Sequence, residues 1–280
     1  MGDEGESVDM GQQQMAFDRS DTKTDAAPIL CLDQVEVIYP NGTVALQPTT
    51  VDFEDGELTV LLGPSGAGKS TLLRTLNLLV RPTSGAVLSR EIGTLDATQS
   101  IRAHRRDTAM IFQQHQLIGR MGAMHNVLLS RLGRHSFWRT LVGFSEEERR
   151  LALECLTRVG LFEKALTRCD SLSGGQQQRV GIARALAQEP KMILADEPVA
   201  SLDPASSERV LNVLRSICKE DRIPVIVSLH QLDYAKAFAD RIIGLAGGQI
   251  VFHGPPTQLS ETVLTQIYGS TGPDATWVQP

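Results

Sequence analysis

The sequence predicts an α/β fold built around a parallel β-sheet, and two observations support this prediction. First, a glycine-rich stretch at residues 63–70 follows an apolar run at 58–62 and precedes a helical pattern at 71–76. A strand, a glycine-rich loop and a helix in this order form a phosphate-binding P-loop, G-x-x-x-x-G-K-[ST]. Second, the apolar runs at 192–195 and 225–229 are typical of strands that are buried on both faces of a parallel sheet.

The chemistry of phosphate binding explains the residue types in the P-loop. Gly63, Gly66 and Gly68 allow backbone conformations that other residues avoid, so successive N–H groups can point at phosphate oxygens. The following helix adds the positive end of its dipole. Lys69 can reach the β- and γ-phosphates, and the hydroxyl of Ser70 can bind Mg²⁺. The alternative is a glycine-rich turn without a ligand. The nucleotide-binding residues expected here are Gly63, Pro64, Ser65, Gly66, Ala67, Gly68, Lys69, Ser70 and Thr71.

Composition limits the class of protein. The chain has 280 residues, 41% hydrophobic and 21% charged, which suits one large domain or two small ones. A net charge of −6 argues against nucleic acid as a partner. The four cysteines lie apart, without a C-x-x-C pair, and predict reduced thiols rather than a metal site. No apolar run could span a bilayer and no signal peptide is evident, so we expect any membrane role to be peripheral.

The chain begins with a polar segment at 1–28, which we expect to be a disordered extension because it offers little apolar surface to bury. Alternating apolar residues between 29 and 62 predict strands, with turns at 40–42 and 55–56. Tyr39 ends the first of these strands. Its ring either packs in the ordinary way or forms a platform for a nucleotide base.

Beyond the P-loop helix, which we expect to run to residue 79, the pattern predicts short strands at 87–92 and 109–112 with a basic helix at 101–106 between them. Residues 117–170 then become helical in pattern, which predicts a helical subdomain inserted into the α/β core.

Two features stand out within this helical stretch. Ser145 and Glu148 form a capping box at the start of a helix that Gly160 would end. The aromatic and basic stretch at 136–141 is either a loop that contacts a partner or a packed corner.

Polar residues follow the predicted buried strands, at the edge where open α/β sheets usually bind ligands. Asp196 is placed to hold Mg²⁺, and Glu197 could orient or deprotonate the attacking water. His230 could touch the γ-phosphate, and Gln113 could reach the metal or the water. Taken singly, Asp196 and Glu197 could be a charge pair at a strand end, and His230 a core histidine. Together with a P-loop on the same edge, they favour nucleotide hydrolysis.

A second helix start also has the features of an anion site. Ser173, Gly174, Gly175 and Gln176 open a helix with exposed backbone N–H groups. One ATP cannot obviously use this site and the P-loop of the same chain. Two chains facing head-to-tail could share each ATP, which predicts a symmetric homodimer with two nucleotides at its interface.

Taken together, these motifs resemble the ATP-binding cassette (ABC) ATPase family over about residues 29–269. The matching motifs are the P-loop at 63–70, the Q-loop at Gln113, the signature at 172–176, the second acidic motif at 192–197, the D-loop at 201–203, the switch histidine His230 and the base-stacking aromatic Tyr39. The resemblance implies a P-loop NTPase core of ABC-ATPase type with an antiparallel β subdomain and an inserted helical subdomain at about 117–170. It also implies hydrolysis of ATP with Mg²⁺ between two chains, adds Asp203 to the nucleotide-binding residues, and leaves 270–280 as a C-terminal tail.

A narrower resemblance is to phosphonate-import ATP-binding subunits. It rests on the stretches at 117–120, 125–128, 131–134, 136–139, 196–204, 228–231, 241–245 and 267–269. The sequence departs from that pattern at His115 and Gln116, where these subunits usually have Phe-Asn, and in its two terminal extensions. The resemblance implies a peripheral protein on the cytoplasmic face of the inner membrane.

The partners implied are two transmembrane permease subunits and a periplasmic solute-binding protein that acts through them. Three alternatives remain open. They are an importer of another small anion such as phosphite or a phosphate ester, a soluble ABC ATPase of translation or DNA repair, and a nucleotide-binding regulator without turnover.

Overall fold

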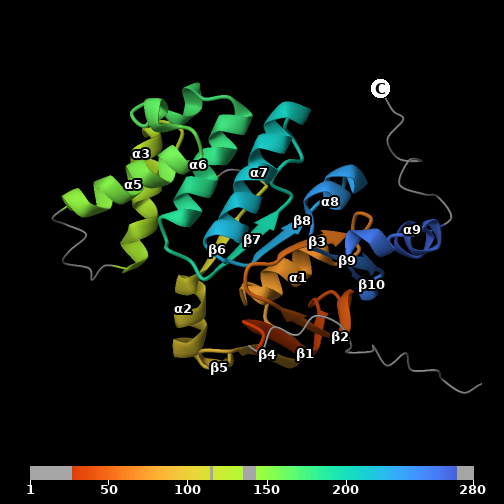
Figure 1. Ribbon diagram of the computed structural model, residues 1–280. Coiled ribbons are helices and arrows are strands. Elements are labelled where there is room, and N and C mark those ends of the chain that lie inside the picture. The colour runs from red at the N-terminus through yellow and green to blue at the C-terminus, as the bar shows by residue number, and fades with distance from the viewer. Residues whose placement is uncertain (1–26, 114–115, 135–142, 270–280) are drawn as a thin grey trace, which may run out of the picture.

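The computed structural model describes residues 27–113, 116–134 and 143–269, which form two β-sheets with helices between and around them (Figure 1). The larger sheet has the strand order β10-β9-β3-β8-β7-β6, and the smaller one has the order β2-β1-β4-β5. In the larger sheet neighbouring strands run parallel, except that β10 is antiparallel to β9. The smaller sheet is antiparallel throughout.

The larger sheet consists of β3 (Leu58–Leu62), β6 (Thr108–Ile111), β7 (Met192–Asp196), β8 (Val225–Ser228), β9 (Arg241–Ala246) and β10 (Gln249–Gly254). The smaller sheet consists of β1 (Leu30–Ile38), β2 (Val44–Phe53), β4 (Ser84–Ser89) and β5 (Gly93–Thr94). The helices are α1 (Lys69–Leu76), α2 (Thr98–Asp107), α3 (Ala123–Leu128), α5 (Glu146–Arg158), α6 (Gly174–Leu186), α7 (Pro204–Glu220), α8 (Leu232–Phe238) and α9 (Glu261–Tyr268). Short 3₁₀ turns lie at Leu129–Arg134, Phe162–Lys164, Cys169–Ser171 and Pro256–Gln258.

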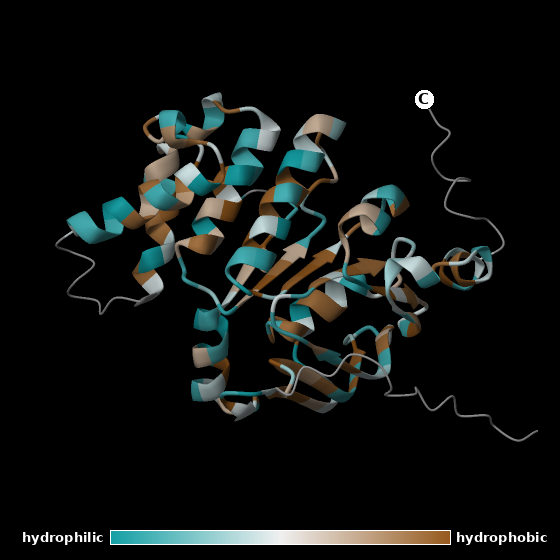
Figure 2. Ribbon diagram, viewed as in Figure 1, coloured by the Kyte–Doolittle hydropathy of each residue, from teal (hydrophilic) through white to brown (hydrophobic). Residues whose placement is uncertain are grey.

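The strands of the larger sheet are buried on both faces, as continuous apolar runs predict. Along β3, Val60 and Leu62 face one core, which they share with α6, α7 and α8. Leu61 faces the other core, which it shares with α1 and the smaller sheet. Because side chains alternate between the faces of a strand, every second residue serves a different core. Figure 2 shows these hydrophobic strands lying between layers of helix, with α1 on the side of the smaller sheet.

Helices α3, α5 and α6 pack against one another and form a group at one end of the molecule (Figure 1). The predicted capping box is confirmed at the start of α5, where the Ser145 N–H donates to Glu148 Oε2 at 2.9 Å. Gly160 adopts a φ of 68° just past the end of α5, as a helix-stop glycine does. The stretch at 136–141 lies outside the described residues, as do residues 1–26 of the predicted extension at 1–28 and the predicted tail at 270–280.

Several element boundaries differ from the sequence-based expectation, including the start of α2 at Thr98 rather than residue 101 and the end of β4 at Ser89 rather than residue 92. Helix α1 ends at Leu76 rather than near residue 79, because Leu78 takes a left-handed φ of 53° that a helix cannot continue. Strand β4 begins at Ser84 rather than Val87 and pairs with β1 from its first residue. Gly85 permits this close pairing, since a Cβ there would lie 2.2 Å from the Gln34 carbonyl oxygen.

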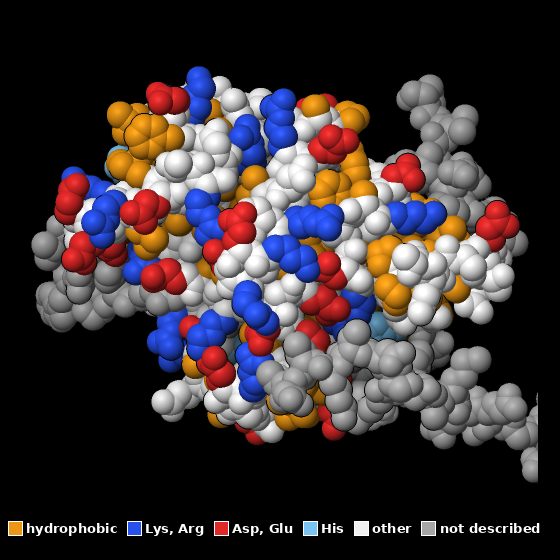
Figure 3. Space-filling view, viewed as in Figure 1, with side chains coloured by type: hydrophobic (Ala, Val, Ile, Leu, Met, Phe, Trp, Pro, Cys, Tyr) orange, Lys and Arg blue, Asp and Glu red, His pale blue; other side chains and the backbone are white. Residues whose placement is uncertain are grey.

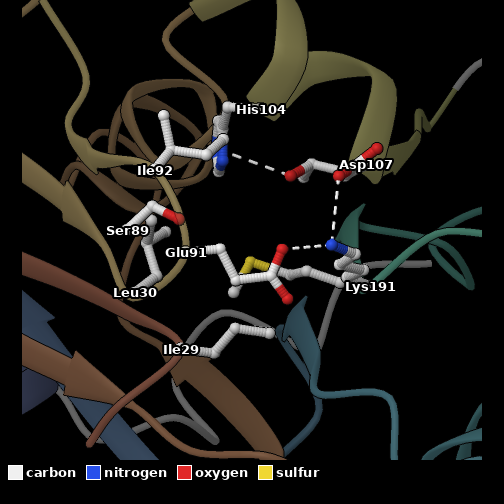
Figure 4. A pocket seen from close by; sticks show the side chains of 10 residues that line it. Ile29, Leu30, Ser89, Glu91, Ile92, His104, Asp107 and Lys191 are labelled. Carbon is white, nitrogen blue, oxygen red and sulfur yellow. Dashed lines mark hydrogen bonds and ion pairs between the residues drawn. The ribbon is translucent and has the colours of Figure 1, made fainter. Parts of the chain in front are cut away.

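A small cavity lies where α2, β4 and the start of β7 meet (Figure 4). Lys191 closes it with ion pairs to Glu91 and to Asp107, the latter at 3.4 Å. His104 lines the cavity, and its Nε2 lies 2.8 Å from the Leu76 carbonyl oxygen. Burial lowers the pKa of His104 below its ordinary value. At about 30 Å³ the cavity has room for water but not for a nucleotide.

None of the helices in the described parts of the chain combines the length and the apolar character that crossing a membrane requires.

Candidate functional site

The P-loop leaves β3 at Gly63 and enters α1 at Lys69, with positive φ values at its three glycines. Gly63 has a φ of 151°, and a Cβ there would lie 2.3 Å from the Leu245 carbonyl oxygen of β9. Gly68 has a φ of 105°, and a Cβ there would lie 2.7 Å from the Ala45 carbonyl oxygen. These contacts explain why glycine is needed at the entry and at the exit of the loop.

Lys69 turns back over this loop. Its Nζ donates to the carbonyl oxygens of Gly63 at 2.6 Å and Pro64 at 3.0 Å. The residue is 5% exposed, and burial lowers the pKa of Lys69, while the charges of Glu197 and Asp196 act in the opposite direction. A buried ammonium that donates to neutral carbonyls would gain from exchanging them for anionic phosphate oxygens.

The carboxylate of Asp196, the last residue of β7, makes three polar contacts. Its Oδ1 accepts hydrogen bonds from Ser70 Oγ at 2.8 Å and from Ser228 Oγ at 3.0 Å, and its Oδ2 lies 3.6 Å from an Arg74 guanidinium nitrogen. Sequence and structure therefore agree that Ser70 and Asp196 are neighbours. A hydroxyl and a carboxylate at this spacing are hard oxygen donors of the kind that Mg²⁺ takes alongside waters and phosphates.

Glu197 sits next to Asp196 in a strained conformation. Its φ of 51° is rare for a residue other than glycine, and such strain is often found at functional sites. The Glu197 N–H donates to Ser228 Oγ at 2.9 Å, and Glu197 Oε1 lies 2.5 Å from His230 Nε2. The carboxylate and the imidazole that the sequence singled out are thus in direct contact.

Sequence reasoning did not assign a role to Ser228. Its buried hydroxyl donates to Asp196 and accepts from the Glu197 backbone, so it fixes the two acidic residues relative to each other. Strand register creates this position, because Asp196 of β7 pairs directly with Ser228 of β8. The available signal was a hydroxyl residue closing an otherwise apolar strand, two positions before His230.

The sequence predicts that Gln113 could reach the metal or the water and that Tyr39 could be a platform for the nucleotide base. Gln113 is exposed and follows β6 by two residues, on the edge that holds Asp196, because Ile111 pairs with Ala195 in parallel. Tyr39 is half-buried, and its hydroxyl lies 3.2 Å from Thr71 Oγ1 in the first turn of α1. The ring of Tyr39 is therefore anchored beside the P-loop helix.

The second predicted anion site begins α6. Ser173 and Gln176 form a capping box, with the Ser173 N–H donating to Gln176 Oε1 at 3.0 Å. Gly175 packs against the start of α7, and a Cβ there would lie 2.7 Å from Ser206 Oγ. Asp203 caps α7 by accepting from the Ser206 N–H at 2.9 Å, and the hydrogen bonds from Ser206 lower the pKa of Asp203. These contacts join the signature to the D-loop rather than to the P-loop of the same chain.

Comparison with known proteins identifies the family. Residues 46–200 match the family model described as ABC transporter. The chain belongs to the ABC transporter family. It is 60% identical over 240 residues to the phosphite import ATP-binding protein PxtA of Stutzerimonas stutzeri, covering 86% of this chain and 87% of that protein. It is 54% identical to a phosphonates import ATP-binding protein, PhnC 3, of Nostoc sp., covering 85% of this chain and 91% of that protein.

Solved structures of the family share the fold. A dimeric post-hydrolysis structure of the ATP-binding cassette MJ0796 with ADP and Pi superposes with a TM-score of 0.71 at 36% identity, covering 81% of this chain and 98% of that one. The cbiO1 protein from Clostridium perfringens, part of a cbiONQ complex, gives a TM-score of 0.75 at 28% identity, covering 86% of this chain and 94% of that one. The predicted fold class and family are confirmed.

Proposed function

We propose that this chain is the ATP-hydrolysing subunit of a bacterial ABC importer that takes up phosphonates. The observation that carries the proposal is the hydrogen-bonded chain at one sheet edge that runs from Ser70 through Asp196 and Ser228 to Glu197 and His230, with the buried Lys69 beside it. This arrangement supports the proposal, because it offers a buried lysine, oxygen donors of the kind that a metal takes and a carboxylate–imidazole pair at one edge.

ATP binding would use the chain's own loop and helix dipole. The backbone N–H groups of the loop after Pro64 would surround the β- and γ-phosphates, and Lys69 would exchange its carbonyl partners for phosphate oxygens. Ser70 and Asp196 would hold Mg²⁺, with Gln113 reaching toward it from the same edge. The metal would neutralise charge on the phosphate oxygens when bound. Tyr39 would stack on the base.

Hydrolysis would depend on Glu197 and His230. Glu197 orients the attacking water and takes up its proton, and His230 holds the Glu197 carboxylate through the 2.5 Å contact. The Ser228 hydroxyl keeps Glu197 in its strained backbone conformation. Catalysis would consist mainly of positioning and of charge stabilisation around a loose phosphoryl transition state.

Completion of the site would require a second copy of the chain. Gly175 packs against Ser206 at the start of α7 in its own chain. The N-terminal end of α6, at Ser173, Gly174, Gly175 and Gln176, would face the γ-phosphate bound by the partner. Asp203 would join this interface. The similar cassette MJ0796 is described as dimeric, which supports a homodimer here. ATP then favours the closed dimer, and hydrolysis removes that preference.

We further propose that the dimer binds two permease subunits from the cytoplasmic face of the inner membrane, with a periplasmic solute-binding protein acting through them. Exposed apolar side chains in the helical region support a partner surface, namely Ile118, Phe162 and Leu166. Figure 3 shows a hydrophobic group at the upper left, over this helical region, on a face where acidic and basic side chains are otherwise interspersed.

Phosphite is the second candidate solute, because the relative at 60% identity is a phosphite import protein. Uptake of labelled methylphosphonate by cells that depend on this chain tests the choice, with phosphite, phosphate and 2-aminoethylphosphonate as unlabelled competitors. Stronger competition by 2-aminoethylphosphonate than by phosphite supports phosphonate import. Complete competition by phosphite alone assigns phosphite.

A further inference from the structure

The C-terminal helix α9 ends beside the P-loop. Ile267 is buried against β9, where its Cδ1 lies 2.5 Å from the position that a Cβ on Gly244 would take. Gly244 pairs with Leu62, the residue before Gly63. A side chain larger than hydrogen at position 244 would therefore displace α9, and the close fit fixes the last turn of α9 at the point where β3 becomes the P-loop.

Tyr268 follows Ile267 and carries a buried polar atom at this place. Its phenol oxygen is enclosed and has no hydrogen-bond partner of standard geometry within the described part of the chain. Because α9 packs on β9, and Gly244 of β9 pairs with Leu62, the phenol lies on the side of the sheet end where Gly63 begins the P-loop. Burial raises the pKa of Tyr268, and the Gly63 backbone lowers it, as a hydrogen-bond donor near a phenol does.

An enclosed hydroxyl without a good partner is costly, because it has lost its hydrogen bonds to water. A phenylalanine would fill the same space without this cost. The hydroxyl can be useful if the P-loop has a second conformation in which the bond to Gly63 forms. The Gly63 carbonyl oxygen accepts from Lys69 Nζ at 2.6 Å, so the backbone on the carbonyl side of Gly63 is well placed to change when Lys69 turns to phosphate.

We propose that Tyr268 is a positioning residue for ATP binding, and that its hydroxyl forms a hydrogen bond with the Gly63 backbone when the P-loop closes on the phosphates. The proposal rests on the proposed function, since it concerns the same nucleotide site. It assigns α9, which carries none of the nucleotide-binding motifs, a part in setting nucleotide affinity.

The test compares wild type with Tyr268→Phe, and uses Thr265→Val as the control. Thr265 lies on the same helix, is exposed, and donates its hydroxyl only within α9, to the Glu261 carbonyl oxygen at 2.9 Å. Calorimetry gives the Kd for the non-hydrolysable analogue AMP-PNP with Mg²⁺, thermal melts give the Tm with and without it, and steady-state kinetics give kcat and KM.

The proposal predicts that Tyr268→Phe raises the Kd and the KM about fivefold, the effect of one ordinary hydrogen bond, and leaves kcat unchanged. The Tm without nucleotide should stay equal or rise, whereas the increase in Tm on adding nucleotide should shrink. Thr265→Val should bind nucleotide like wild type. A lower Tm with an unchanged Kd would overturn the proposal, because it is the mark of a purely structural hydroxyl. Wild type that binds no nucleotide would overturn the proposed function and this inference together.

Discussion

Ser228→Ala is the perturbation that the site geometry defines best. The substitution removes one hydroxyl from a fully buried position and leaves the strand backbone in place. It breaks the 3.0 Å bond to the Asp196 carboxylate and removes the acceptor of the Glu197 N–H at 2.9 Å. A hydrogen bond to a charged group contributes about 1.5–3 kcal/mol, and an orphaned buried donor costs about 1–3 kcal/mol. We expect a loss of stability of about 3 kcal/mol.

Thermal melts and ATP hydrolysis rates together measure this effect. A loss of about 3 kcal/mol corresponds to a decrease in Tm of roughly 6–12 °C for a chain of this size. Hydrolysis should fall at least about tenfold, because Glu197 loses the contact that fixes its backbone and small displacements are costly in a positioned site. Ser216→Ala is the matched control, since its hydroxyl bonds to Glu220 on the surface of α7, and it should change stability by less than about 0.5 kcal/mol. A Ser228→Ala protein with the Tm and hydrolysis rate of wild type would refute the reasoning.

Three further predictions follow from single contacts. Lys69→Ala should abolish ATP binding in calorimetry, and unchanged affinity would contradict the P-loop assignment. Gly68→Ala should weaken ATP binding in the same assay, because its Cβ would lie 2.7 Å from the Ala45 carbonyl oxygen at a φ of 105°. Burial lowers the pKa of His104, so below pH 6.5 the unfolded chain binds a proton at this residue more readily than the folded chain does. The free energy of unfolding should therefore decrease as the pH is lowered. The decrease in Tm between pH 7.5 and 5.5 should be smaller in His104→Gln, and equal slopes would contradict this account.

The elements of the fold that depend on local residue patterns could be predicted from the sequence. The continuous apolar runs before Gly63 and Asp196 predicted strands buried on both faces, and these strands occupy the interior of the larger sheet. The capping box at Ser145 and Glu148 could also be predicted, because its two hydrogen bonds join residues three positions apart. The roles assigned to Gln113, Tyr39 and the other site residues stay predictions until nucleotide is bound.

Other features arise only from long-range pairing. Ser228 acquires its role because the register of β8 on β7 sets it opposite Asp196, 32 residues away in the chain. Tyr268 lies at the P-loop end of the sheet because α9 packs across β9. A single sequence does not show how distant strands and helices pair in space. The positions of Ser228 and Tyr268 relative to the site could therefore not be inferred from residue patterns alone. The early end of α1 has a similar cause, since Leu78 is buried in a left-handed conformation that its residue type does not favour.

The most direct test of the central claim is the rate of ATP hydrolysis by the purified chain and its Glu197→Gln variant, measured with nucleotide binding and molecular mass in MgATP. The account predicts that wild type hydrolyses ATP. The variant should bind ATP with similar affinity, hydrolyse it at least about a hundredfold more slowly, and accumulate at twice the monomer mass. A variant that hydrolyses ATP at the wild-type rate would contradict the assignment of Glu197 and, with it, the proposed site.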